Sequence, residues 1–120
     1  MENPVIHFEV LWNDHRAAQK YYSELFGWKF RGADADVPYG IVEADEGQGI
    51  GGGVGGTPET SGHATFYVGV KNVQDHLAMA EELGGKRIMG PVEVPGGPVV
   101  GLFSDPHGHT VGLAQLPVDQ

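Results

Sequence analysis

Residues 5–11, VIHFEVL, decide the fold, because a stretch of the same kind returns in the second half of the chain as residues 64–70, ATFYVGV. Both alternate apolar side chains with others at the period of two that is typical of a half-buried strand. A shift of 58 residues aligns the halves, and the positions that it matches are Phe8 with Phe66, Val10 with Val68, and residues 24–29 (ELFGWK) with 82–87 (ELGGKR). The sequence therefore predicts two related halves.

Each half continues with one helix. The first is expected to begin at Asn13 or Asp14, both good N-cap residues, and to end at Gly27. The second is expected to begin near Asn72 and to end at the glycine pair 84–85. Short strand-like pieces separated by Gly and Pro follow each helix, at residues 28–31, 39–44, 50–54, 86–89, 99–103 and 110–116. The order strand, helix, strand, strand, strand thus occurs twice and predicts an α+β fold with two helices and about eight strands.

The chain of 120 residues is the size of one domain. We expect module one at about residues 4–54, a linker at about 55–62 that is rich in Gly, Pro, Ser and Thr, and module two at about 63–117. The formal match of residues 47–52, GQGIGG, to a dinucleotide-binding motif is discounted, because the GVGGTP that follows cannot begin the helix that such a motif needs.

Charge and composition exclude several classes of function. Sixteen acids against seven bases give a net charge of −9, which disfavours nucleic acid and an anionic membrane surface as partners. The absence of cysteine excludes thiolate zinc sites, iron–sulfur clusters and a cysteine nucleophile. No apolar run approaches the roughly 18 residues of a membrane span, and no secretory signal is visible, so we expect a cytoplasmic protein.

One face of the predicted sheet is left for a ligand. If the helices pack on the face of Phe8 and Val10, the other face carries a polar selection of side chains. These are His7, Glu9, His63, Thr65 and Tyr67. Such a selection on a buried surface predicts a cavity that binds a small organic molecule.

The chain resembles the vicinal oxygen chelate superfamily, which includes glyoxalase I, bleomycin-resistance proteins and extradiol dioxygenases. The residues that carry the likeness are 5–10 (VIHFEV), Asp14, 22–28 (YSELFGW), His63 and 105–109 (DPHGH). The resemblance implies a glyoxalase/bleomycin-resistance-like fold, a cupped mixed sheet made of two βαβββ modules that enclose the site.

The resemblance also implies a metal site, with one ligand missing. Family members that use a metal take ligands from the first strand of each module and from the last strand, which corresponds here to His7, His63 and Gly112. Glycine has no side chain to coordinate an ion. Glu9, two residues from His7, could complete a site for iron, manganese or zinc. Alternatively, His7 and Glu9 are cavity-wall residues that hydrogen-bond a ligand, water or each other.

Two functions remain open at this point. The first is a binding protein of the bleomycin-resistance type without a complete metal triad, which Gly112 favours. The second is a divalent-metal-dependent lyase or isomerase, or a dioxygenase-like enzyme, that uses His7 and His63 with Glu9 as third ligand or general base.

Two further expectations concern assembly and the site. We expect a homodimer, because a four-stranded module exposes a concave face that needs a facing module, and the glycine-rich residues 50–54 suit close packing. We also expect His7, Glu9, His63 and Tyr67 to line one shared cavity with Gly112 on its wall. A buried Glu9 carboxylate must then have a partner, because an unpaired one is costly.

Overall fold

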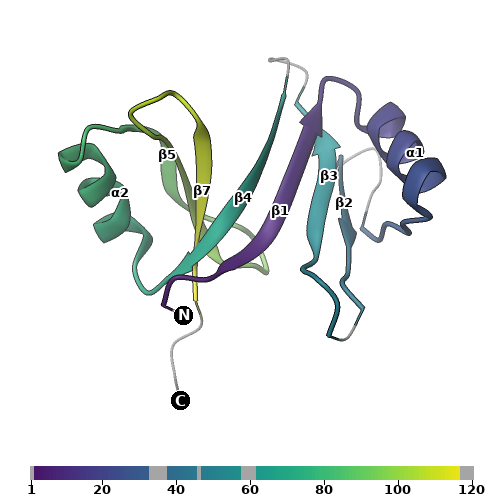
Figure 1. Ribbon diagram of the computed structural model, residues 1–120, viewed down its shortest axis with the longest axis horizontal. Coiled ribbons are helices and arrows are strands. Elements are labelled where there is room, and N and C mark those ends of the chain that lie inside the picture. The colour runs from purple at the N-terminus through teal and green to yellow at the C-terminus, as the bar shows by residue number, and fades with distance from the viewer. Residues whose placement is uncertain (1, 33–37, 46, 58–61, 117–120) are drawn as a thin grey trace. The chain divides into compact units, whose positions relative to one another are not determined.

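The computed structural model describes residues 2–32, 38–45, 47–57 and 62–116. They form seven strands and two helices (Figure 1). The chain divides into two compact units, the first-half unit, His7–Thr65, and the second-half unit, Met1–Ile6 with Phe66–Gln120. The α+β fold predicted from the sequence is confirmed. Because both strands that begin the halves are divided between the units, the module boundaries at 4–54 and 63–117 stay a prediction.

The first-half unit holds β1 (Val5–Trp12), α1 (His15–Phe26), β2 (Tyr39–Val42) and β3 (Gly52–Gly56). In Figure 1, β3 lies between its two neighbours and pairs with β1 in parallel and with β2 in antiparallel orientation. β3 ends at Gly56, so the first two residues of the linker expected at 55–62 belong to this strand. Residues 58–61 of that linker lie outside the described part of the chain.

The ends of α1 are those predicted. The Asp14 carboxylate accepts hydrogen bonds from the backbone N–H groups of Arg16 and Ala17, both at 3.1 Å. Gly27 ends the helix with a φ of 74°, the left-handed conformation that favours glycine. The helix packs on β3, where Ala18 and Val54 are fully buried.

The predicted strand at residues 28–31 is wrong. Only Arg31 of this segment pairs with another strand residue, Ile41. The Trp28 ring lies 5.4 Å from that of Phe8 and 4.9 Å from that of Phe26, so packing against rings holds the segment together with the two backbone hydrogen bonds between Arg31 and Ile41. The described residues thus form seven strands where about eight were expected.

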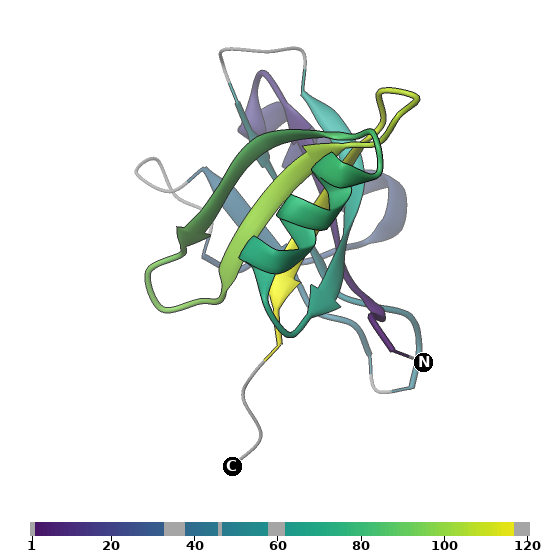
Figure 2. The same cartoon turned by 90° about the vertical axis from the view of Figure 1, so that its left-hand side faces the viewer.

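The second-half unit contains five elements, β4 (His63–Val70), α2 (Val73–Glu82), β5 (Lys86–Glu93), β6 (Val99–Ser104) and β7 (Thr110–Gln115). β7 pairs with β4 in parallel and with β6 in antiparallel orientation, and β5 pairs with β6 at the edge. Figure 2 shows α2 lying across these strands. The Asn72 side chain caps the helix as predicted, accepting a hydrogen bond from the Asp75 N–H at 2.9 Å.

The core of this unit lies between α2 and the sheet. Its buried members are Val70, Val73, Leu77 and Leu113. Gly101 of β6 allows the close approach of the helix, because a Cβ there would lie 2.9 Å from the Leu77 side chain. The helix-facing side of β4 is therefore the one that carries Val68 and Val70, as the alternation predicted.

Each unit contains a contact between the opening strand of one half and the residue just before the opening strand of the other half. In the second-half unit, the Gly69 N–H donates to the Pro4 carbonyl at 2.7 Å. In the first-half unit, Gly62 lies so close to the Leu11 carbonyl that a Cβ on Gly62 would overlap it. Neither helix in the described ranges is long and apolar enough to cross a membrane.

Candidate functional site

The strand β1 presents different chemistry on its two faces. Phe8 packs against Trp28 and Val10 lies opposite Val54, on the side that α1 covers. Strand alternation therefore turns His7 and Glu9 to the opposite side. Four side chains of the first-half unit are joined there by hydrogen bonds, and we call them the polar face: His7, Glu9, Tyr39 and His63.

Glu9 and His63 form the closer of the two pairs. The distance from Glu9 Oε2 to His63 Nε2 is 2.7 Å, and the two side chains are 9% and 24% exposed. At this distance and burial the contact is strong, and stronger still when the imidazole is protonated. The pair is joined across 54 residues of sequence, which gives Glu9 the partner that its burial demands.

His7 and Tyr39 form the second pair. The His7 Nε2 atom lies 2.9 Å from the Tyr39 hydroxyl, and the two rings are nearly parallel at 18°. Burial lowers the pKa of His7 below its ordinary value, and the nearby Glu9 charge counteracts only part of this. His7 is therefore a neutral imidazole at neutral pH.

Tyr39 was not among the predicted site residues. Its ring covers β3, since a Cβ on Gly53 would overlap the ring and one on Gly55 would lie 2.8 Å from it. The glycines of β3 are thus filled by rings of the same chain, so they give no support to a partner subunit packing there. The sequence did contain a signal, because a glycine-rich strand leaves space that large side chains of neighbouring strands must fill. The sequence does not show which neighbouring strand supplies those side chains.

In the second-half unit, Tyr67 and Gly112 lie side by side. They are register partners in the parallel pair of β4 and β7. A Cβ on Gly112 would lie 2.6–2.7 Å from atoms of the Tyr67 ring, so the ring occupies the space that a side chain on Gly112 would need. Tyr67 is buried and points away from the face of Val68 and Val70 that packs against α2.

The structure therefore brings the predicted site residues together in two groups. His7, Glu9 and His63 lie in the first-half unit with half-buried Thr65, and Tyr67 and Gly112 lie in the second-half unit. The single cavity expected to contain all of them stays a prediction.

The residues present do not fit the metal centre that the resemblance implies. A ligating histidine offers one ring nitrogen to the ion and uses the other in a hydrogen bond; Nε2 of His7 faces the Tyr39 hydroxyl and Nε2 of His63 faces Glu9, so only Nδ1 of either ring could be offered to an ion. The position expected to hold the acidic ligand is a glycine covered by Tyr67. Across the described ranges, no three His, Asp or Glu side chains are grouped so as to hold an ion. Metal ligation by His7 and His63 stays a prediction.

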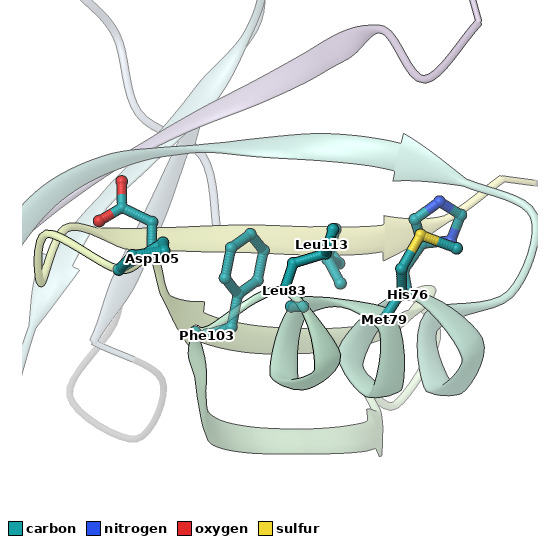
Figure 3. Close-up of a pocket in the computed structure, with 9 residues that line it drawn as sticks. His76, Met79, Leu83, Phe103, Asp105 and Leu113 are labelled. Atoms are coloured by element: carbon teal, nitrogen blue, oxygen red, sulfur yellow. The ribbon is translucent and has the colours of Figure 1, made fainter.

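Two hollows in the structure are lined by residues that were not predicted as site residues. One, of about 510 Å³, lies in the first-half unit along residues 26–31 and the neighbouring part of β2. The other, of about 270 Å³, lies in the second-half unit between α2 and the strands (Figure 3). Figure 3 shows Leu83, Phe103 and Leu113 inside it, with Asp105 at one end and His76 and Met79 at the other. The sequence patterns gave no signal for either hollow.

Solved structures similar to this chain cover nearly all of it. A hypothetical protein from Bacillus halodurans C-125 has a TM-score of 0.67 at 16% identity, covering 100% of this chain and 99% of its own. A Streptomyces coelicolor methylmalonyl-CoA epimerase variant in complex with 2-nitronate-propionyl-CoA has a TM-score of 0.65 at 11% identity, covering 100% and 99%. A Legionella pneumophila protein described as an NAD-dependent benzaldehyde dehydrogenase has a TM-score of 0.65 at 12% identity, covering 92% and 98%. At these identities the likeness shows the fold alone.

Sequence comparison assigns the family. No curated protein matches the chain. The family model described as Glyoxalase/Bleomycin resistance protein/Dioxygenase superfamily matches residues 5–113. This match includes both opening strands, both helices and most of β7. The chain therefore belongs to the glyoxalase/bleomycin resistance protein/dioxygenase superfamily.

Proposed function

We propose that this chain binds a small organic molecule on the polar face of the first-half unit, without a metal ion held by its histidines. The observation that carries the proposal is the pairing of both imidazoles. The Nε2 atom of each ring is already within hydrogen-bond distance of a protein group, the Tyr39 hydroxyl or the Glu9 carboxylate. The pairs fix the orientation of four polar side chains before any ligand arrives, which lowers the entropic cost of binding.

The chemistry of the face favours a planar ligand with hydrogen-bond donors. Glu9 is a buried acceptor, and the neutral His7 adds no positive charge to compete with a donor or cation on the ligand. The Tyr39 ring lies over Gly53 and offers a flat apolar surface beside these polar groups. A few fixed polar groups next to an aromatic wall are typical of small-molecule sites. We place the protein in the cytoplasm with such a ligand as its partner.

The first experiment separates this proposal from the metal-dependent enzyme. Protein purified without an affinity tag or added metal is analysed for iron, manganese and zinc, and then titrated with each ion by calorimetry. The expected result is less than stoichiometric metal, and weak binding that His63→Ala leaves unchanged. Stoichiometric metal that His63→Ala removes would overturn the proposal and favour a lyase, isomerase or dioxygenase-like enzyme that uses His7, Glu9 and His63.

The second experiment looks for the ligand. Thermal shift assays test planar heteroaromatic amines together with methylmalonyl-CoA, because one solved neighbour is an epimerase in complex with methylmalonyl-CoA. Compounds that stabilise the chain are measured against Tyr39→Phe and Glu9→Gln, each expected to weaken binding by about tenfold through the loss of one hydrogen-bonding group. Tyr21→Phe, an exposed tyrosine of α1, is the matched control and should change nothing. Binding that survives both site variants would contradict the assignment to the polar face.

A further inference from the structure

The hollow of about 510 Å³ in the first-half unit lies where a strand ladder stops. Arg31 and Ile41 exchange two backbone hydrogen bonds, at 3.0 and 2.9 Å, and form an isolated bridge. An antiparallel ladder that continued from this bridge would join Lys29 to Glu43 as its next hydrogen-bonded pair. The ladder does not continue, and residues from both sides of the missing pairs line the hollow.

The size of this hollow is that of a ligand site. Small-molecule sites enclose roughly 300–1,000 Å³. The hollow of about 510 Å³ falls within that range, whereas the hollow beside α2, at about 270 Å³, falls below it. We therefore ask what chemistry the larger hollow offers to a small organic molecule.

Aromatic rings form one wall of the hollow. Phe26, Trp28 and Phe30 all line it. The Trp28 ring lies 4.9 Å from that of Phe26 and 6.4 Å from that of Phe30. It is also in contact with the rings of Phe8 and Tyr22, at 5.4 and 5.9 Å, which hold it in place. Phe26 is 56% exposed, so this wall presents an open aromatic surface on which the ring of a ligand can pack.

Four ionisable side chains also line the hollow, and two of them are paired with each other. The distance from Arg31 Nε to Glu43 Oε1 is 2.7 Å, so the charges of this pair offset one another. Neither Lys29 nor Asp45 has an ion-pair partner among the residues that the structure describes. The lining therefore offers one positive and one negative group to a ligand. An anion without a positive group would in addition be repelled by the net charge of −9.

We propose that this hollow binds a zwitterion that carries an aromatic ring, of which an aromatic α-amino acid is the smallest example. The ring of the ligand packs on Phe26 and Trp28. The ammonium group of the ligand pairs with Asp45 and its carboxylate with Lys29. Each of the three chemical features of the ligand thus meets a group of the lining that has the complementary character.

This site is separate from the polar face. None of the four side chains of the polar face lines the hollow. Trp28 packs on Phe8, and strand alternation turns Phe8 to the side of β1 opposite to His7 and Glu9. The zwitterion site therefore does not rest on the function proposed above, and either proposal can fail without the other.

The first test compares ligands that differ by one feature. Isothermal titration calorimetry of the full chain uses L-phenylalanine and three relatives: 3-phenylpropionate lacks the ammonium group, 2-phenylethylamine lacks the carboxylate, and L-alanine lacks the ring. L-Phenylalanine is expected to bind, and each relative should bind about tenfold or more weakly, because each loses one charge-assisted contact or the ring contact. No binding of L-phenylalanine, or equal binding of any relative, would overturn the proposal.

The second test assigns the two charges to residues. Lys29→Gln and Asp45→Asn should each weaken the binding of L-phenylalanine by about tenfold. Asp45→Asn should also remove the preference over 3-phenylpropionate, and Lys29→Gln the preference over 2-phenylethylamine. Lys71→Gln and Asp75→Asn, at exposed residues of the second-half unit, are the matched controls and should preserve both preferences. Circular dichroism checks the fold of all four variants. Preferences that survive in Lys29→Gln and Asp45→Asn would contradict the assignment to this hollow.

Discussion

The two units use the same backbone positions for different chemistry. The shift of 58 residues places His7 on Thr65 and Glu9 on Tyr67, so a histidine and a carboxylate of the first opening strand correspond to two hydroxyl-bearing side chains in the second. In both units a tyrosine ring covers a strand glycine, Tyr39 over Gly53 and Tyr67 over Gly112. The repeated fold thus places a tyrosine ring beside a strand glycine in both units, and in the first-half unit the tyrosine hydroxyl lies 2.9 Å from the Nε2 atom of His7.

The two tyrosines reach their glycines in different ways. In the second-half unit the tyrosine is buried and lies directly across the ladder from its glycine. In the first-half unit the tyrosine is half-buried, comes from the antiparallel neighbour, and reaches a histidine. A ring therefore fills the space beside Gly112 in one half, whereas in the other half the tyrosine also contacts a histidine of the polar face.

The largest effect is expected from Gly112→Glu. Its Cβ would lie 2.6–2.7 Å from the Tyr67 ring, so we expect a loss of about 3 kcal/mol in the free energy of unfolding. Restoring the acid should then give no metal affinity while the ring stays in place. Urea denaturation of Gly112→Glu, Tyr67→Ala and the double variant checks this, since the double variant should lose less than the two single losses together. Additive losses would show that the ring does not block the position.

Glu9→Ala should have the next largest effect. It leaves the His63 Nε2 atom without its partner at 2.7 Å, which is expected to cost about 1–3 kcal/mol. Glu9→Gln keeps a hydrogen-bonding group of the same size and should recover much of that loss. Thr65→Ala, on β4 in the same unit, is the comparison outside the two pairs. Equal losses for Glu9→Ala and Glu9→Gln would contradict this, because they would mean that the carboxylate itself is required and that a neutral hydrogen-bonding group of the same size does not replace it.

Tyr39→Phe tests the His7–Tyr39 pair and is expected to lower the free energy of unfolding by less than Glu9→Ala does. It removes the hydroxyl that His7 contacts at 2.9 Å and keeps the ring over Gly53, so a loss of about 1 kcal/mol is expected. Tyr21→Phe should cost less, because this residue is about half exposed on α1. The readout that isolates the pair is the His7 ring signal in NMR, which should change in Tyr39→Phe and stay constant in Tyr21→Phe.

The smallest effect concerns an ionisable group of the second-half unit. Asp105 accepts hydrogen bonds from the backbone of His109 and His107, and these bonds, that of His109 first, lower the pKa of the carboxyl group below 3.8. A lowered carboxyl pKa stabilises the fold above the ordinary value, and this contribution is lost as the pH falls through the lowered value. Asp105→Asn should therefore flatten the acid side of the stability curve slightly, as measured by urea midpoints at several acidic pH values. An unchanged curve would mean that the hydrogen bonds to Asp105 do not contribute to the acid sensitivity of the fold.

Local signals predicted the fold well where a single residue type is required. The caps at Asp14 and Asn72 and the left-handed Gly27 lie where the sequence placed them, because each satisfies or ends a helix by its own chemistry. The segment 28–31 failed because its aromatic residues have a strand-like composition but find rings, and not a partner strand, to pack against. Composition alone does not distinguish these outcomes.

The site was predictable only within each strand. Period-two alternation placed His7 and Glu9 on one side of β1, as the structure has them. The partners came from residues 32 and 54 positions away, Tyr39 and His63, and no local pattern determines which distant strands become neighbours. Alternation had already placed His63 on the polar face, and the family resemblance added a role for it, whereas Tyr39 was not among the residues predicted for the shared cavity.

The residues just before β1 and β4 connect the two halves of the sequence in a reciprocal way. Pro4 bonds to Gly69 in one unit and Leu11 lies against Gly62 in the other, and the shift of 58 residues exchanges these contacts, since it carries position 4 to 62 and 11 to 69. Each unit therefore includes a short segment that comes from the other half of the sequence. A half-length ancestor of such a chain could complete itself only by trading strand ends with a sibling molecule, which is domain swapping. Fusion of two copies into one polypeptide would have turned that exchange into a permanent internal one.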